Sequence, residues 1–251
     1  MTFIHSGDAG DVIYALPCIR AAIKRSSPPL DAASLILGTK RGTLHPFTES
    51  WAANLTPLIQ AQPYISDCWR QKPGDTWTFD LDPFVSLLFK RYQRGKRITS
   101  YVCDLLGLPY NCADEPWLTV DTPTHVPGCP VVVNLTTRYR NKWFPWSKVY
   151  HNYQGQMVFI GLDSEHSEFE RHVGSIPYCR TENALEMAQL IAGCKLFIGN
   201  QSLAYAIAEG MKKPTVLETS ADFPNCIWTR GNAVFFVRGH ELRLPKLERL
   251  K

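Results

Sequence analysis

The chain has 251 residues, of which 45% are hydrophobic and 20% are charged, a composition typical of a soluble globular protein. The net charge of +4 is compatible with anionic ligands such as nucleotides and is too small to indicate a nucleic-acid-binding surface. The longest apolar runs are too short to cross a bilayer, and the first ten residues lack the pattern of a signal peptide. We therefore expect a cytoplasmic protein with one large domain or two smaller ones.

The eight cysteines are scattered, with no Cys-x-x-Cys pair and no zinc-finger spacing. In a chain without a secretion signal, this pattern predicts reduced and mostly buried thiols rather than disulfides or metal ligands.

The first half of the chain shows strands and helices in alternation. The apolar spacing predicts, in chain order, a strand over 2–5, a glycine turn over 6–10, a helix over about 11–25, strands over 33–37, near 65–70 and near 76–80, and helical residues 84–108 interrupted around Gly95. This order is typical of an α/β domain.

Five prolines within residues 109–130 predict a linker, and a second α/β series follows it. The predicted elements are strands over 130–134, 157–161, 195–199, 214–218 and 233–237, and helices over 182–192 and 202–211. The sequence therefore predicts two Rossmann-like α/β domains with parallel sheets, over residues 1–125 and 126–251.

In such sheets ligands bind at the carboxyl ends of the strands, so the residues that follow strands are candidates for function. In the stretch Gly7-Asp8-Ala9-Gly10-Asp11, the glycines allow a sharp turn and a close backbone approach to a ligand. An aspartate such as Asp11 fits a helix N-cap, a general base, or both roles together, and two carboxylates would repel a phosphate there.

Three later segments also follow strands. Arg140 and Lys142 stand among aromatic residues and suit a diphosphate, or belong to an anchored surface loop. Glu165 suits ribose hydroxyls or caps the next helix, and Ser202 begins a helix whose N-terminus suits an anion. The basic run 90–97 is interpreted as a solvated helix end, or as an anionic acceptor site.

Together these segments resemble glycosyltransferase family 9, which includes the ADP-heptose:lipopolysaccharide heptosyltransferases and has the GT-B fold of two Rossmann-like domains facing a cleft. Gly10-Asp11-Val12 followed by Pro17 is similar to the family's opening, where the aspartate is the proposed catalytic base, so the resemblance points to Asp11. Residues 142–145 resemble the family's Lys-x-Trp-Pro element, whose lysine contacts the donor diphosphate. Glu165 falls near the family's nucleotide-contacting acid.

The strongest resemblance covers residues 184–217, which follow the family's order of helix, strand, Gly-Asn, helix, Lys-Pro and strand without a gap. The family has Gly-Asn-Asp-(Ser/Thr)-Gly and then a histidine, whereas this chain has Gln201, Leu203 and Ala206 in place of the aspartate, glycine and histidine. The resemblance implies that the donor-binding residues are Lys142, Arg140, Glu165, Asn200, Gln201 and Ser202, with loop glycines Gly7, Gly10 and Gly199.

The sequence thus favours an inverting, metal-independent glycosyltransferase that moves a sugar from a nucleotide-diphosphate donor to a surface glycan or lipopolysaccharide-type acceptor, with no cofactor. Asp11 would deprotonate the acceptor hydroxyl. Two alternatives stay open: a phage-type enzyme acting on hydroxymethylated DNA bases, and a degenerate, non-catalytic nucleotide-sugar-binding protein. Peripheral membrane contact also stays open.

Overall fold

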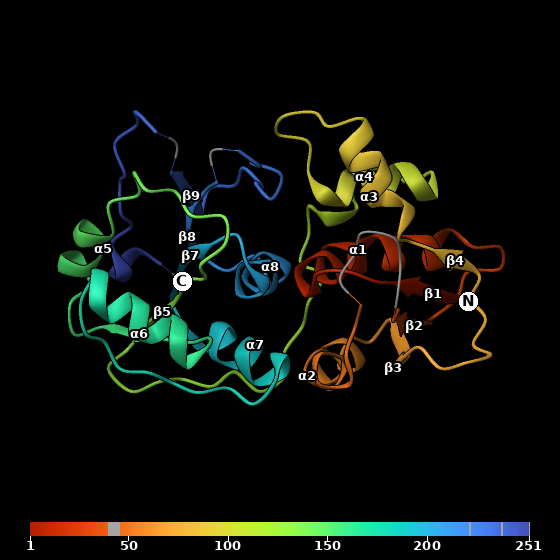
Figure 1. The fold of residues 1–251 in the computed structure, drawn as a ribbon, viewed down its shortest axis with the longest axis horizontal. Coiled ribbons are helices and arrows are strands. Elements are labelled where there is room, and N and C mark those ends of the chain that lie inside the picture. Colours follow the sequence, from red (N-terminus) through yellow and green to blue (C-terminus); the bar gives the residue numbers. More distant parts are fainter. Residues whose placement is uncertain (40–45, 221, 237, 251) are drawn as a thin grey trace. The chain divides into compact units, whose positions relative to one another are not determined.

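The computed structural model describes residues 1–39, 46–220, 222–236 and 238–250. The chain divides into two compact units, residues 1–119 with 183–185, and residues 120–182 with 186–251. Each unit contains one sheet of parallel strands with helices packed beside it (Figure 1). The predicted class, α/β with two parallel sheets, is confirmed.

The sheet of the first unit has the strand order β3-β2-β1-β4. Its strands are β1 (Thr2–His5), β2 (Ala33–Leu37), β3 (Ile65–Arg70) and β4 (Phe79–Asp80). The two central strands are short apolar runs, because helices and loops cover both faces of a parallel sheet. Phe3, Ile4, Leu35 and Ile36 are accordingly inaccessible to solvent.

The helices of the first unit are α1 (Ala9–Arg25), α2 (Glu49–Gln60), α3 (Pro83–Lys90), α4 (Ile98–Leu106) and the 3₁₀ turn η1 (Tyr110–Ala113). Figure 1 shows α3 beside α4, whereas α2 packs against β3. The predicted interruption of helical residues 84–108 is confirmed, since α3 ends at Lys90 and α4 begins at Ile98. The sequence did not predict α2.

The sheet of the second unit has the order β6-β5-β7-β8-β9. Its strands are β5 (Val131–Asn134), β6 (Met157–Phe159), β7 (Leu196–Asn200), β8 (Thr215–Glu218) and β9 (Ala233–Phe236), and its helices are α5 (Trp146–Asn152), α6 (Asp163–His172), α7 (Ala184–Gly193), α8 (Leu203–Gly210) and the 3₁₀ turn η2 (Leu247–Arg249). All five strands lie where they were predicted, to within two residues.

Among the described residues, no helix combines the length and the apolar character needed to cross a membrane.

Candidate functional site

The carboxyl edge of the second sheet carries three buried polar side chains. Asn134, Asn200 and Glu218 are the last residues of β5, β7 and β8, and each follows an apolar run. The strand register pairs Asn134 with Gly199 and Asn200 with Glu218, so the three residues lie at one edge. Buried polar groups require hydrogen-bond partners. The partners at this edge are the loops that follow the strands.

Asn134 connects two of these loops. Its Nδ2 donates to the Ile160 carbonyl over 2.8 Å, and its Oδ1 accepts from Ser202 Oγ over 2.8 Å. Ser202 Oγ also accepts from Tyr205 N at 3.3 Å and so caps α8. Because both roles of the hydroxyl are used inside the protein, the anion-binding capacity at this helix start comes from the backbone N–H groups of its first turn.

Asn200 and Gln201 position loops. Asn200 Oδ1 accepts from Thr136 N at 3.0 Å, and its Nδ2 donates to the carbonyl of Arg138 at 2.6 Å. Gln201 Nε2 donates to the Phe223 carbonyl at 2.9 Å. Both predicted donor-binding side chains are therefore engaged within the protein, and direct contact of either with a donor stays a prediction.

Glu218 organises the loop that contains Arg140. Its fully buried carboxylate accepts from Arg140 Nε at 3.0 Å, from Trp146 Nε1 at 2.5 Å and from the backbone N–H of Asn141. Arg140 is 39% exposed, so it is held at its inner side while it still faces solvent. Glu218 was not predicted from the sequence. Its signal was an acidic residue at the end of an otherwise apolar strand.

A pocket of about 170 Å³ opens next to this loop. Its lining residues are Leu135, Thr136, Thr137, Arg140, Glu165, Glu168, Phe169, His172 and Val173. The structure thus brings together Arg140 and Glu165, two predicted donor-binding residues that are 25 positions apart in the sequence. Lys142 is not among the described residues that line the pocket.

Glu165 is fixed at the start of α6. Its Oε2 accepts from Leu162 N at 3.1 Å, so the capping role considered from the sequence is present. Burial raises the pKa of Glu165, and the hydrogen bond from Leu162 opposes that shift. A carboxylate held in this way is a good acceptor for sugar hydroxyls.

Two glycines make the edge compact. A Cβ atom at Gly161, where φ is +132°, would lie 2.6 Å from Asn134 Nδ2 and 2.9 Å from Glu165 Oε2. A Cβ atom at Gly199 would lie 2.5 Å from the Asn134 backbone oxygen. The assignment of Gly199 as a loop glycine is corrected, because it lies inside β7 and allows close approach of β5.

Lys142 lies on the exposed part of the same loop. Its Nζ is 5.3 Å from the centroid of the Trp143 ring system, and the guanidinium carbon of Arg238 is 4.2 Å from that centroid. The half-exposed tryptophan therefore holds two cations by cation–π contact.

The first unit carries the Asp11 turn at the carboxyl end of β1. Gly7 has φ +111°, a conformation that favours glycine, whereas Gly10 lies in the first turn of α1. The assignment of Gly10 as a loop glycine is therefore corrected. Asp8 occupies the N-cap position, and its carbonyl accepts from Asp11 N at 2.9 Å. Asp11 is half-buried and lies in the first turn of α1, near the positive end of the helix dipole.

The residues before the Asp11 turn, His5 and Ser6, are held by buried polar contacts. The His5 ring is inaccessible to solvent, its Nδ1 lies 2.6 Å from the Ser6 carbonyl, and it packs 5.3 Å from the Phe84 ring. Ser6 N donates to Asp82 Oδ1 at 2.5 Å. Burial lowers the pKa of His5 to about 4, so the imidazole is neutral at pH 7.

The two parallel sheets, with polar residues at their carboxyl edges, define a Rossmann-like architecture, in which ligands bind at the carboxyl ends of the strands. No protein-family model matches the sequence, and no curated protein matches it. The fold, in contrast, is similar to that of solved glycosyltransferases.

Three solved structures illustrate the likeness. A glycosyl transferase family 9 protein from Veillonella parvula has a TM-score of 0.57 and 11% identity, and the match covers 94% of this chain and 84% of that chain. E. coli heptosyltransferase WaaC with ADP has a TM-score of 0.59 and 12% identity, and the match covers 94% of this chain and 92% of that chain. The iron-containing dodecameric glycosyltransferase TibC from enterotoxigenic E. coli has a TM-score of 0.60 and 14% identity, and the match covers 95% of this chain and 62% of that chain. At these identities the likeness establishes the fold. It agrees with the GT-B expectation from the sequence.

Proposed function

We propose that this chain is a glycosyltransferase that transfers a sugar from a nucleotide-diphosphate donor to an acceptor hydroxyl. The observation that carries the proposal is the pocket at the carboxyl edge of the second sheet, where Arg140 and Glu165 meet. The similarity of the fold to a heptosyltransferase with ADP over 94% of this chain supports the same conclusion.

The charges in and beside the pocket suggest how a donor would be oriented. The pocket, about 170 Å³, is smaller than the ~300 Å³ or more of most small-molecule sites, so it would hold only part of a nucleotide sugar. Glu165 repels phosphate and accepts hydrogen bonds from hydroxyls, so we assign the ribose to it. Arg140, Lys142 and the N-terminus of α8 provide the positive charge for the diphosphate.

The proposed reaction is a single displacement with inversion. The Asp11 carboxylate takes the proton of the acceptor hydroxyl, and the oxygen attacks the anomeric carbon as the bond to the diphosphate breaks. Arg140 and Lys142 balance the charge of the departing diphosphate, a role that a metal ion has in other transferases. In this proposal residues 1–125 form the acceptor-side domain and residues 126–251 the donor-side domain.

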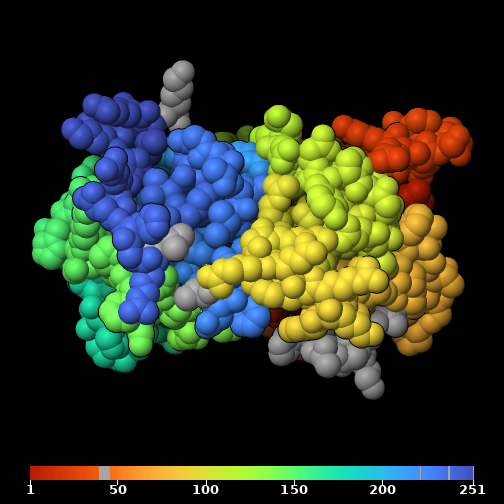
Figure 2. All heavy atoms as spheres, turned by 90° about the horizontal axis from the view of Figure 1, so that it is seen from above, coloured from red at the N-terminus to blue at the C-terminus, as the bar shows by residue number. Residues whose placement is uncertain are grey.

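The acceptor proposed is a surface glycan or a lipopolysaccharide-type molecule. Residues 91–95, within the basic run, are exposed, and this segment (yellow) lies on the face shown in Figure 2. An exposed basic segment on the first unit suits an acceptor that carries phosphate or carboxylate groups.

Calorimetric titration with ADP, UDP, GDP and CMP tests the donor site. We expect one nucleotide to bind to the wild type, and Glu165→Gln to weaken its binding by about tenfold, the effect of one lost charge-assisted hydrogen bond. Glu241→Gln is the control, because Glu241 is a 69% exposed residue outside the pocket. Absence of binding at millimolar nucleotide would refute the proposal. Binding without any donor turnover would favour the non-catalytic alternative.

A further inference from the structure

Three cysteines that are far apart in the sequence meet in the first unit. Cys18 comes from α1, Cys103 from α4 and Cys112 from η1. The Sγ–Sγ distances are 3.5 Å between Cys18 and Cys103, 3.8 Å between Cys18 and Cys112, and 3.4 Å between Cys103 and Cys112. Cys18 and Cys103 are fully buried, and Cys112 is half-buried.

The triangle has the dimensions of a metal-binding site. Tetrahedral zinc has Zn–S bonds of about 2.3 Å, which place its sulfur ligands about 3.8 Å apart. A single ion therefore fits among the three Sγ atoms with small adjustments. A disulfide needs an S–S distance of about 2.05 Å and would use only two of the three thiols.

The ligand chemistry is uniform. Among the described residues, the three thiols form this group without a histidine or carboxylate. Thiolate ligands select thiophilic ions such as zinc, copper(I) and iron over magnesium, calcium or manganese. Three thiolates and a divalent ion leave one negative charge. The positively charged Arg20 lies beside this group, because its Nη2 donates to the Cys112 carbonyl at 3.4 Å.

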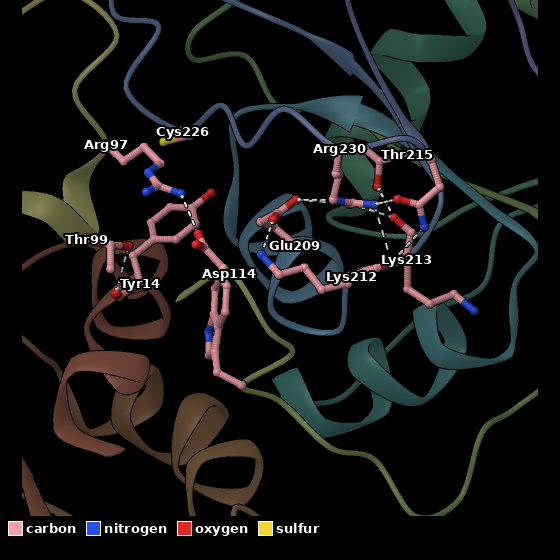
Figure 3. A network of polar contacts seen from close by, with 12 residues as sticks. Tyr14, Arg97, Thr99, Asp114, Glu209, Lys212, Lys213, Thr215, Cys226 and Arg230 are labelled. Atoms are coloured by element: carbon pink, nitrogen blue, oxygen red, sulfur yellow. Dashed lines mark hydrogen bonds and ion pairs between the residues drawn. The ribbon is translucent and has the colours of Figure 1, made fainter. Parts of the chain in front are cut away.

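We propose that Cys18, Cys103 and Cys112 bind one zinc ion as a three-thiolate site, with the fourth position available to solvent on the side of Cys112. The ion would join α1, α4 and η1. Two contacts shown in Figure 3 already hold these elements together. Thr99 Oγ1 of α4 donates to the Tyr14 carbonyl of α1 at 3.1 Å, and Arg97, before α4, pairs with Asp114, after η1, at 3.3 Å.

The site has a structural role in this proposal. Cys18 follows Asp11 by two helical turns on α1, so an ion at Cys18 fixes the helix that begins with the Asp11 turn. The ion takes no part in the transfer reaction. The proposal does not depend on the proposed function and is tested without an activity assay.

The first test is the metal content of the full chain, expressed with zinc in the medium and without a polyhistidine tag. Elemental analysis should find about one zinc per chain in the wild type, and Cys103→Ser and Cys112→Ser should each lower zinc affinity at least ~10-fold. Cys179→Ser is the matched control, because Cys179 is also half-buried but lies in the second unit. Equal zinc in wild type and Cys112→Ser would overturn the proposal.

The second test uses the wild type alone, so it stands even where a serine variant fails to fold. Cobalt(II) added to metal-stripped protein should give the thiolate-to-metal charge-transfer absorption and tetrahedral ligand-field bands, and zinc should abolish both. Titration in denaturant with chelator should find all eight thiols. Six thiols, with no cobalt spectrum, would show a disulfide pair instead. Eight thiols without a cobalt spectrum would show a plain thiol cluster.

Discussion

The buried carboxylate of Glu218 gives the sharpest prediction about the second unit. Glu218→Gln keeps the shape of the side chain and replaces one acceptor oxygen by an NH₂ group. Three donors, from Arg140, Asn141 and Trp146, point at the native carboxylate. When the amide oxygen turns toward Arg140 and Asn141, the NH₂ group faces the indole N–H of Trp146. The NH₂ group and the indole N–H are then both donors without an acceptor.

The free-energy cost follows from these contacts. Each of the two buried donors left without a partner costs about 1–3 kcal/mol. The lost ion pair adds about 0–1 kcal/mol, because Arg140 is 39% exposed and solvent screens it. We expect the free energy of unfolding of the second unit to fall by about 2–7 kcal/mol, which lowers its Tm by roughly 10 °C or more. Nucleotide affinity should fall as well, since the loop at residues 140–146 loses its anchor.

Urea denaturation and amide hydrogen exchange of the full chain measure both effects. Protection should decrease in residues 138–146, and Glu241→Gln should stay within 0.5 kcal/mol of the wild type, as is usual for a surface change. A Glu218→Gln protein with wild-type stability and unchanged exchange in this loop would refute the role assigned to Glu218.

Three further predictions concern buried groups. His5 has a folded pKa of about 4 against 6.5 when unfolded, so the unfolded chain binds more protons between these values, and stability falls as the pH drops from 6.5 to 4, by about 3 kcal/mol in total. His5→Asn should flatten this slope in urea titrations at pH 7, 5.5 and 4.5; an unchanged slope contradicts the assignment. Gly199→Ala should cost about 1–3 kcal/mol by overpacking, whereas Gly231→Ala, with open space around the new methyl group, should be nearly neutral by the same assay. Glu209 is fully buried between Lys212 and Arg230, at 2.7 and 3.0 Å (Figure 3), so Glu209→Gln should cost about 3 kcal/mol. Adding Arg230→Met should restore part of that stability, and a larger loss in the double variant would contradict the pairing.

The strands were predictable because burial on both faces of a parallel sheet produces short apolar runs with polar residues at their ends. Val131-Val132-Val133 before Asn134 is one example. The helix α6 was not predicted as a defined element, because only Phe169 of its ten residues is buried and the apolar spacing is missing. In α2, Pro57 lies inside the helix and obscured its pattern.

The neighbourhood of the candidate site was predictable, and the partners of its residues were not. Because ligands bind at the carboxyl ends of parallel strands, the sequence identified the segments of Arg140, Glu165 and Ser202. In the structure these segments surround the carboxyl edge of the second sheet. The pairing of Arg140 with Glu218 spans 78 residues, and the contact of Cys18 with Cys103 spans 85. Such contacts arise from the tertiary fold, and local spacing contains no signal for them.

In the proposed function this chain transfers a sugar from a nucleotide donor, with Asp11 as the base. The most direct measurement is the release of nucleoside diphosphate from the donor whose nucleotide binds, compared between wild type and Asp11→Asn at equal nucleotide affinity. Loss of a positioned general base should lower the rate about 10²–10⁴-fold while nucleotide binding is retained. Equal release rates in the two proteins would contradict the role of Asp11. No release from any donor by the wild type would contradict the transferase itself.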